Sequence, residues 1–168
     1  MDRITFLICH ILKPLLDHIP SHLKNTHDAL VKLQAVPKEK LKGKTFFTAD
    51  VEALYTNINV ETAINNIMDF ASENKQHLNL YGLTLTDIHE LMEISLLNSY
   101  FVYDRQVYIQ LQGFFMGVRP APIGAIIKMW TLEKYLRKVI FQRAIVNQWA
   151  RVLKHHVTCV TPRPVSVL

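Results

Sequence analysis

The chain has 168 residues, of which 49% are hydrophobic and 20% are charged, a composition typical of a globular protein rather than a disordered segment. Its two cysteines, Cys9 and Cys159, lie far apart, and no histidine or cysteine cluster has the spacing of a zinc site. These features exclude a disulfide framework and a zinc-finger class. We therefore expect an intracellular protein, either nuclear or cytoplasmic.

The charge is unevenly distributed along the chain, although the net value is only +5. Residues 1–104 contain 13 acids and 9 Lys or Arg, whereas residues 105–168 contain 10 Lys or Arg and a single acid, Glu133. A basic half of this kind suits contact with a polyanion such as nucleic acid. A basic, solvated helix would produce the same pattern, so charge alone leaves both interpretations open.

The first twenty residues contain apolar side chains at helical spacing. These are Ile4, Leu7, Ile8, Ile11, Leu12, Leu15, Leu16 and Ile19. A signal peptide is the alternative, but His10, Lys13 and Pro14 interrupt the apolar run and no small-residue cleavage site follows. We expect an amphipathic helix here. No run of about 18 apolar residues exists anywhere in the chain, so we expect no membrane span.

A second helix is predicted over about residues 25–36, with Leu30 and Leu33 facing inward, and the basic stretch 37–44 is predicted to be a loop. The aromatic and β-branched run 45–51 predicts a strand. Residues 57–59 are then expected to turn the chain. A third helix is predicted over residues 61–73, with an apolar face formed by Ile64, Ile67, Met68 and Ala71.

A polar loop is expected over residues 74–82. Thr84 and Asp87 then form a capping-box pattern, which predicts a helix from there to about residue 98. Its buried face is expected to contain Ile88, Leu91, Met92 and Leu96. Residues 100–112 predict a hairpin that turns at Asp104-Arg105. The remaining expected elements are irregular backbone over 113–122, a helix over 123–153 and a loose tail. Together, the expected helices and strands indicate an α+β or mixed α/β fold.

Asp50 is the first candidate for chemistry, because it lies at the end of an apolar strand and before a turn. Mg²⁺ prefers oxygen ligands and is usually held by one or two carboxylates together with substrate phosphates. An aspartate at this place could instead only cap the turn that follows. The aspartate alone does not distinguish these alternatives.

The run ADVEALYTNI, residues 49–58, resembles motif A of reverse transcriptases, and most closely the version in Penelope-like retroelements. By that resemblance Asp50 is a catalytic metal ligand, and the backbone carbonyl of Val51 is a second contact to Mg²⁺. Tyr55 would lie under the sugar of the incoming nucleotide, where it excludes a 2′-hydroxyl. The alternative for Tyr55 is packing in the core.

The run QLQGFFMGVRPAP, residues 110–122, resembles motif B of the same family. The resemblance assigns the pocket for the template base and the incoming dNTP to Gln110, Gly113, Met116, Gly117 and Pro122. This chain departs from the family at Phe115, where a small residue is usual, and at Val118-Arg119, where Ser-Pro is common. Glu133 matches an acidic family position, for which we expect a structural role.

The upstream run LICHILKPLLDHIPSHLKNTHDALVKL resembles the helices that precede motif A, so the resemblance covers roughly residues 5–150. It implies a helix-rich α+β fold, the partial fingers and palm of a reverse transcriptase. The expected regions are fingers-side helices over 1–44, a partial palm over 45–150 and a divergent tail over 151–168. The implied partners are an RNA or DNA template–primer and a dNTP.

The pair of adjacent aspartates that the family carries in motif C is missing, since no aspartate follows Asp104. Nucleotide addition by two metal ions needs several carboxylates, and Glu52 and Glu133 do not replace the pair. We therefore expect an RNA-directed DNA polymerase domain of a retrotransposon that is truncated and inactive alone. The alternatives are a non-catalytic nucleic-acid-binding remnant and an interaction module with exposed apolar faces.

Overall fold

The computed structural model describes residues 2–43, 47–48, 51–142 and 163–164. The chain divides into two compact units, residues 1–20 with 53–145, and residues 21–52 with 146–168. These units group the chain differently from the three regions expected from the sequence, and that functional division stays a prediction. The described elements are helices and two small antiparallel sheets, in agreement with the coarse α+β class.

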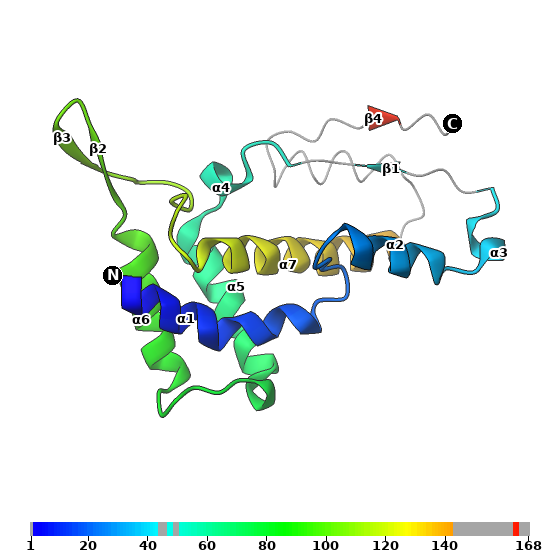
Figure 1. The fold of residues 1–168 in the computed structure, drawn as a ribbon, viewed down its shortest axis with the longest axis horizontal. Helices are drawn as coiled ribbons and strands as arrows, with labels where there is room; N and C mark the ends of the chain where they lie inside the picture. The colour runs from blue at the N-terminus through cyan, green and yellow to red at the C-terminus, as the bar shows by residue number, and fades with distance from the viewer. Residues whose placement is uncertain (1, 44–46, 49–50, 143–162, 165–168) are drawn as a thin grey trace. The chain divides into compact units, whose positions relative to one another are not determined.

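Among its described residues, the first unit contains four longer helices, several short helical segments and one hairpin (Figure 1). The helical elements are α1 (Asp2–Leu12), η1 (Lys13–His18), α4 (Leu54–Asn57), α5 (Val60–Glu73), η2 (Lys75–His77), α6 (Leu85–Leu97) and α7 (Ala121–Gln142). The expected N-terminal helix changes to a 3₁₀ helix at Lys13. Pro14 accounts for this change, because proline has no amide hydrogen for an α-helical bond.

The core of the first unit lies where α5 packs against α6 and α7, and where α1 packs against α6. The predicted inner faces are largely confirmed. Ile64, Ile67 and Ala71 of α5 are buried, as are Ile88, Met92 and Leu96 of α6, while Met68 and Leu91 are partly buried. Helical periodicity therefore identified the core-facing residues of both helices correctly.

Side chains cap the N-termini of α5 and α6. The Asn59 side-chain oxygen accepts a hydrogen bond from the Thr62 amide at 2.8 Å. The predicted capping box is confirmed: the Thr84 amide donates to the Asp87 carboxylate at 2.6 Å, and the Asp87 amide donates to the Thr84 hydroxyl at 3.1 Å. These three hydrogen bonds satisfy amides that a helix leaves without a backbone partner.

The predicted hairpin is also confirmed, as strands β2 (Tyr100–Tyr103) and β3 (Gln106–Ile109). Asp104 and Arg105 form its two-residue turn and have φ angles of 47° and 61°. Positive φ at both central residues is the signature of a type I′ turn, whose twist suits an antiparallel pair. The irregular segment that follows ends at Ala121, where α7 begins.

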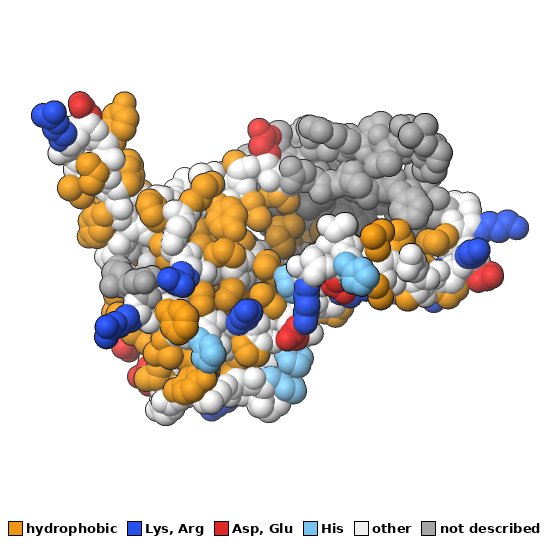
Figure 2. Space-filling model, in the orientation of Figure 1, with side chains coloured by type: hydrophobic (Ala, Val, Ile, Leu, Met, Phe, Trp, Pro, Cys, Tyr) orange, Lys and Arg blue, Asp and Glu red, His pale blue; other side chains and the backbone are white. Residues whose placement is uncertain are grey.

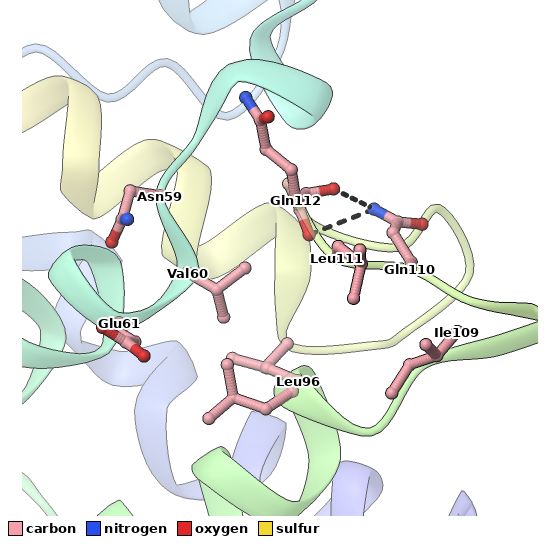
Figure 3. A pocket seen from close by; sticks show the side chains of 10 residues that line it. Asn59, Val60, Glu61, Leu96, Ile109, Gln110, Leu111 and Gln112 are labelled. Carbon is pink, nitrogen blue, oxygen red and sulfur yellow. Dashed lines mark hydrogen bonds between the residues drawn. The ribbon is translucent and has the colours of Figure 1, made fainter.

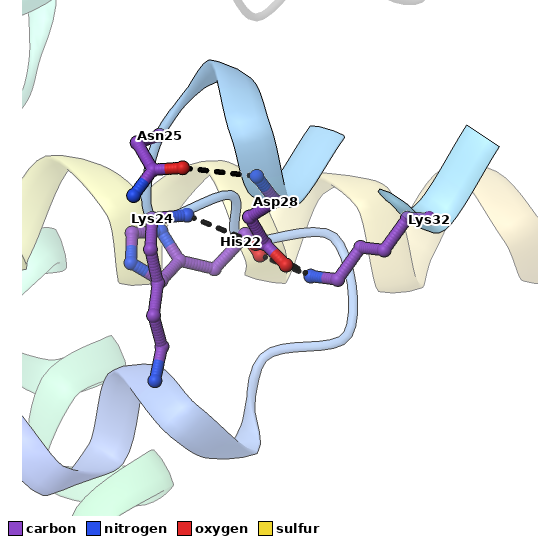
Figure 4. Close-up of polar contacts among 5 residues, drawn as sticks. All are labelled: His22, Lys24, Asn25, Asp28 and Lys32. Atoms are coloured by element: carbon purple, nitrogen blue, oxygen red, sulfur yellow. Dashed lines mark hydrogen bonds and ion pairs between the residues drawn. The ribbon is translucent and has the colours of Figure 1, made fainter. Parts of the chain in front are cut away.

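The second unit contains α2 (Thr26–Gln34), α3 (Lys38–Leu41) and strand β1 (Phe47–Thr48), which pairs antiparallel with β4 (Arg163–Pro164). Asn25 caps α2 by accepting from the Asp28 amide at 2.9 Å (Figure 4). Lys32 donates to the Asp28 carboxylate at 3.1 Å, which links consecutive turns of the helix.

Two expectations for this unit were wrong. Helix α3 forms within the stretch that was predicted to be a loop. Leu30 and Leu33 were expected to face inward, but their side chains are 51% and 45% exposed. Helical spacing shows which residues share a face, but not whether another element covers that face. Of the strand predicted over residues 45–51, Phe47–Thr48 is observed as strand, whereas Val51 lies outside it. No helix among the described residues is long and apolar enough to span a membrane.

Candidate functional site

The structure brings the end of the first motif-like segment against the start of the second. The Phe114 amide donates a hydrogen bond to the Tyr55 carbonyl, with an N–O distance of 2.7 Å. A Cβ atom on Gly113 would lie 2.6 Å from the Tyr55 carbonyl oxygen and 2.6 Å from Thr56 Cα. Gly113 also has a φ of +80°, so both the space and the backbone angle require glycine here.

Tyr55 lies in the short helix α4, which Ala53 precedes with a left-handed φ of 51°. The Thr56 hydroxyl donates to the Ala53 carbonyl at 3.0 Å and holds this turn together. Tyr55 is half-buried and packs against the hydrophobic core, in agreement with the alternative that its ring is a packing residue. Its place under a nucleotide sugar stays a prediction.

Phe114 anchors the loop in the core. Its side chain is only 1% exposed, and its ring lies against Gly124 of helix α7. A Cβ atom on Gly124 would approach the Phe114 ring to 2.8 Å. Sequence reasoning missed both residues. The available signal was a glycine within an otherwise apolar helical pattern, which marks a close packing contact.

Gln110 organises the loop through its side-chain amide. The Nε2 atom donates to the carbonyls of Gln112 at 2.8 Å and Gly113 at 3.1 Å (Figure 3). The Gln110 backbone amide donates to the Ser99 carbonyl at 2.9 Å, at the base of the hairpin. Gln110 therefore has a structural role in shaping the loop, and its expected contact with the template base stays a prediction.

Further along the loop, exposed residues alternate with the half-buried Phe115 and Val118 and the buried Pro120. Met116 is 71% exposed, Gly117 has a φ of +115°, and Pro122 is exposed in the first turn of α7. The Arg119 guanidinium, at a position that departs from the family, lies 5.7 Å from the centre of the Phe6 ring. Its charge also partly offsets the rise that burial causes in the pKa of the Cys9 thiol.

A small cavity of about 230 Å³ lies between the start of α5, the end of α6 and the segment after β3 (Figure 3). Its lining residues are Asn59, Val60, Glu61, Leu96, Leu97, Ile109, Gln110, Leu111, Gln112 and Gly113. Ligand pockets for compounds of drug size are typically about 300–1,000 Å³. The cavity is smaller than that range.

The expected metal ligands are not assembled by the described residues. Asp50 lies outside the described ranges, and Val51 belongs to the second unit. Within the described ranges, no three His, Cys, Asp or Glu side chains form a group that could hold a metal ion. The Mg²⁺ site therefore stays a prediction.

Glu133 lies partly exposed in helix α7, and its expected structural role stays a prediction. The neighbouring Lys134 pairs with Glu73 of α5 at 3.5 Å and lies over the Phe70 ring at 5.6 Å. Lys134 thus contributes to the packing of α5 against α7.

Comparisons of the chain with known protein families, curated proteins and solved structures find no match. The resemblance to reverse transcriptases therefore stays a prediction from the sequence of two segments and their lead-in. The contact of Gly113 with Tyr55 is a separate, spatial observation, because sequence order alone does not bring the two segments together.

Proposed function

We propose that this chain is part of a reverse-transcriptase domain of the Penelope-like type and that it holds a template–primer and a dNTP. The observation that carries the proposal is the close approach of Gly113 to Tyr55 and Thr56. It joins the two segments that the resemblance assigns to the nucleotide, and Met116, Gly117 and Arg119 of the loop are exposed beside them.

The charge distribution supports a nucleic-acid partner. Residues 105–137, which are all described, contain five Lys or Arg and one acid. Positively charged side chains neutralise phosphates and release counterions, which makes such binding strongly dependent on salt.

We propose that the chain alone binds without extending a primer. Two-metal nucleotide addition requires carboxylates that hold both ions, and Glu133 is the only acid after Asp104. An extension assay with a recessed template–primer and Mg²⁺ or Mn²⁺ tests this statement. Extension by the chain that is abolished in Asp50→Asn would contradict it.

Binding is tested by fluorescence anisotropy with an RNA–DNA template–primer over a series of salt concentrations. We expect the logarithm of the affinity to fall linearly with the logarithm of the salt concentration. Met116→Ala should weaken binding, whereas Leu111→Ala, at a 90% exposed position near the same loop, is the matched control. Absent or salt-independent binding would remove the nucleic-acid proposal.

An interaction module is the second candidate, because the hairpin exposes apolar side chains. Val102 and Val107 of the hairpin are 70% and 69% exposed, and Leu111, just after it, is 90% exposed. Exposed apolar surface of this kind favours association with another protein surface. Concentration-dependent mass in light scattering, together with absent nucleic-acid binding, would favour this function over the first.

A further inference from the structure

The β2–β3 hairpin exposes both of its faces to solvent and extends away from the helices of its unit (Figures 1 and 2). Its register places Phe101 opposite Tyr108, and Tyr103 opposite Gln106. Because side chains alternate along a strand, these four residues share one side, which we call the aromatic face. The opposite face contains Tyr100, Val102, Val107 and Ile109.

The rings of the aromatic face form an ordered cluster. Phe101 and Tyr108 stack with ring centres 5.5 Å apart and planes 19° from parallel. Tyr103 lies 6.4 Å from Tyr108 and is tilted by 58°. The Tyr108 hydroxyl donates a hydrogen bond to the Gln106 side-chain oxygen at 3.1 Å, and this bond restrains the orientation of the Tyr108 ring.

These rings remain open to solvent. Phe101, Tyr103 and Tyr108 are 41%, 71% and 40% exposed. Two phenol hydroxyls and the Gln106 amide make this face polar at its edges, whereas the opposite face combines three aliphatic side chains with the single ring of Tyr100. Flat rings with polar edges suit a partner that stacks and forms hydrogen bonds.

The turn of the hairpin presents one basic side chain to an anionic partner. Arg105 lies exposed in the turn beside Asp104, the only acid of the hairpin. Beyond the hairpin, the chain up to Arg137 contains four more Lys or Arg and one acid, and three of these basic residues lie in helix α7. Unpaired nucleic acid combines aromatic bases with phosphates, and proteins bind it with exposed aromatic rings beside basic side chains.

We propose that the aromatic face of the β2–β3 hairpin is a stacking surface for single-stranded nucleic acid. Bases stack on Phe101, Tyr103 and Tyr108, and Arg105 contacts a phosphate. The inference deepens the proposed function and rests on it, because the strand held here is the unpaired part of the template. Stacking is tolerant of sequence, since every base has an aromatic face.

Two ligands separate this inference from the proposed function. One is a blunt RNA–DNA hybrid, and the other is the same hybrid with a single-stranded RNA overhang of about 8 nucleotides, within the usual range for such sites. We expect the full chain to bind the second ligand more tightly. Phe101→Val and Tyr108→Val should each reduce that preference at least about fivefold, because stacking contributes roughly 1–3 kcal/mol per base.

The hairpin provides matched controls. Tyr100→Val removes a ring from the opposite face and should leave the preference for the overhang unchanged. Tyr108→Phe keeps the ring, loses the hydroxyl bonded to Gln106, and should also preserve it. Valine has a high strand propensity, so these variants should retain the hairpin. Unchanged thermal unfolding verifies that the core is intact.

If Phe101→Val and Tyr108→Val bind the overhang ligand as tightly as the unchanged protein does, the proposed stacking surface is wrong. Salt-dependent binding of the blunt hybrid would then still support the proposed function. Failure to bind either ligand would remove both proposals. A change of mass in light scattering for Phe101→Val, with overhang binding unchanged, would assign the hairpin to a protein partner and overturn the inference.

Discussion

The Phe114 amide donates a hydrogen bond to the Tyr55 carbonyl over 2.7 Å, and the preceding Gly113 lies directly against Thr56. Two segments about 50 residues apart in the chain are thereby joined through their backbones. Side-chain substitutions on the loop surface leave this contact in place. The contact is most sensitive to substitution at Gly113, because a single methyl group there would overlap the backbone of Thr56.

Gly113→Ala should destabilise the first unit strongly. Its Cβ atom would lie 2.6 Å from both Thr56 Cα and the Tyr55 carbonyl oxygen, and the φ of +80° is strained for alanine. Overpacking typically costs about 1–3 kcal/mol, and a left-handed residue adds about 1–2 kcal/mol. Urea unfolding should show a loss of at least about 2 kcal/mol in the free energy of unfolding.

Gly82→Ala is the matched control for this effect. Gly82 has a similar φ of +85°, but a Cβ atom there would meet nothing within 4 Å. Its cost should be limited to the backbone strain of about 1–2 kcal/mol. Equal costs for the two variants would show that the contact of Gly113 with Thr56 does not constrain the native state.

Gly124→Ala and Phe114→Ala should interact in a double-mutant cycle. Alanine normally stabilises a helix by about 1 kcal/mol relative to glycine, but here its Cβ would lie 2.8 Å from the Phe114 ring. We expect Gly124→Ala to destabilise the unchanged protein and to become neutral or stabilising in Phe114→Ala. The same effect of Gly124→Ala in both backgrounds, measured by urea unfolding, would contradict this coupling.

Local chemistry made much of the fold predictable from sequence. The capping box of Thr84 and Asp87 and the turn at Asp104-Arg105 depend on neighbouring residues, and both are observed. The burial of Ile67 and Met92 followed from helical spacing, because one apolar stripe on each helix has to face the core.

Features that depend on distant residues were less predictable. Leu30 and Leu33 share a helical face, but their exposure depends on whether another element covers that face. The loop containing Gly113 was singled out from its sequence, whereas its contact with Tyr55 required the fold. Gly124 was missed because the size of its neighbour, Phe114, decides its role.

Asp87 should make the stability of α6 depend on pH. Hydrogen bonds from the Thr84 amide and hydroxyl hold the pKa of the Asp87 carboxyl below its ordinary value of 3.8. A carboxyl with a lowered folded pKa stabilises the protein above its unfolded pKa, and this contribution is lost as pH falls through the folded pKa. Asp87→Asn should therefore be less stable than the unchanged protein at neutral pH.

The difference between these two proteins should shrink as the pH is lowered below the ordinary pKa of aspartate. Urea unfolding of both proteins at a series of pH values measures it. Glu90→Gln, further along the same helix, is the control for removing an acidic side chain. A difference that stays constant down to the lowest pH would show that the Asp87 charge does not act through the capping box.

Arg105→Gly should stabilise the hairpin locally. Arg105 has a φ of 61° in the two-residue turn, where glycine avoids the steric cost of about 1–2 kcal/mol that other residues incur. The resulting Asp-Gly pair is also favoured in type I′ turns. Amide hydrogen exchange in β2 and β3 should slow several-fold, while global unfolding changes little, because the hairpin lies outside the core.

Arg105→Ala removes the same charge but keeps a Cβ, so its exchange rates should stay near those of the unchanged protein. Slower exchange in both variants would attribute the effect to the lost charge instead of the backbone angle.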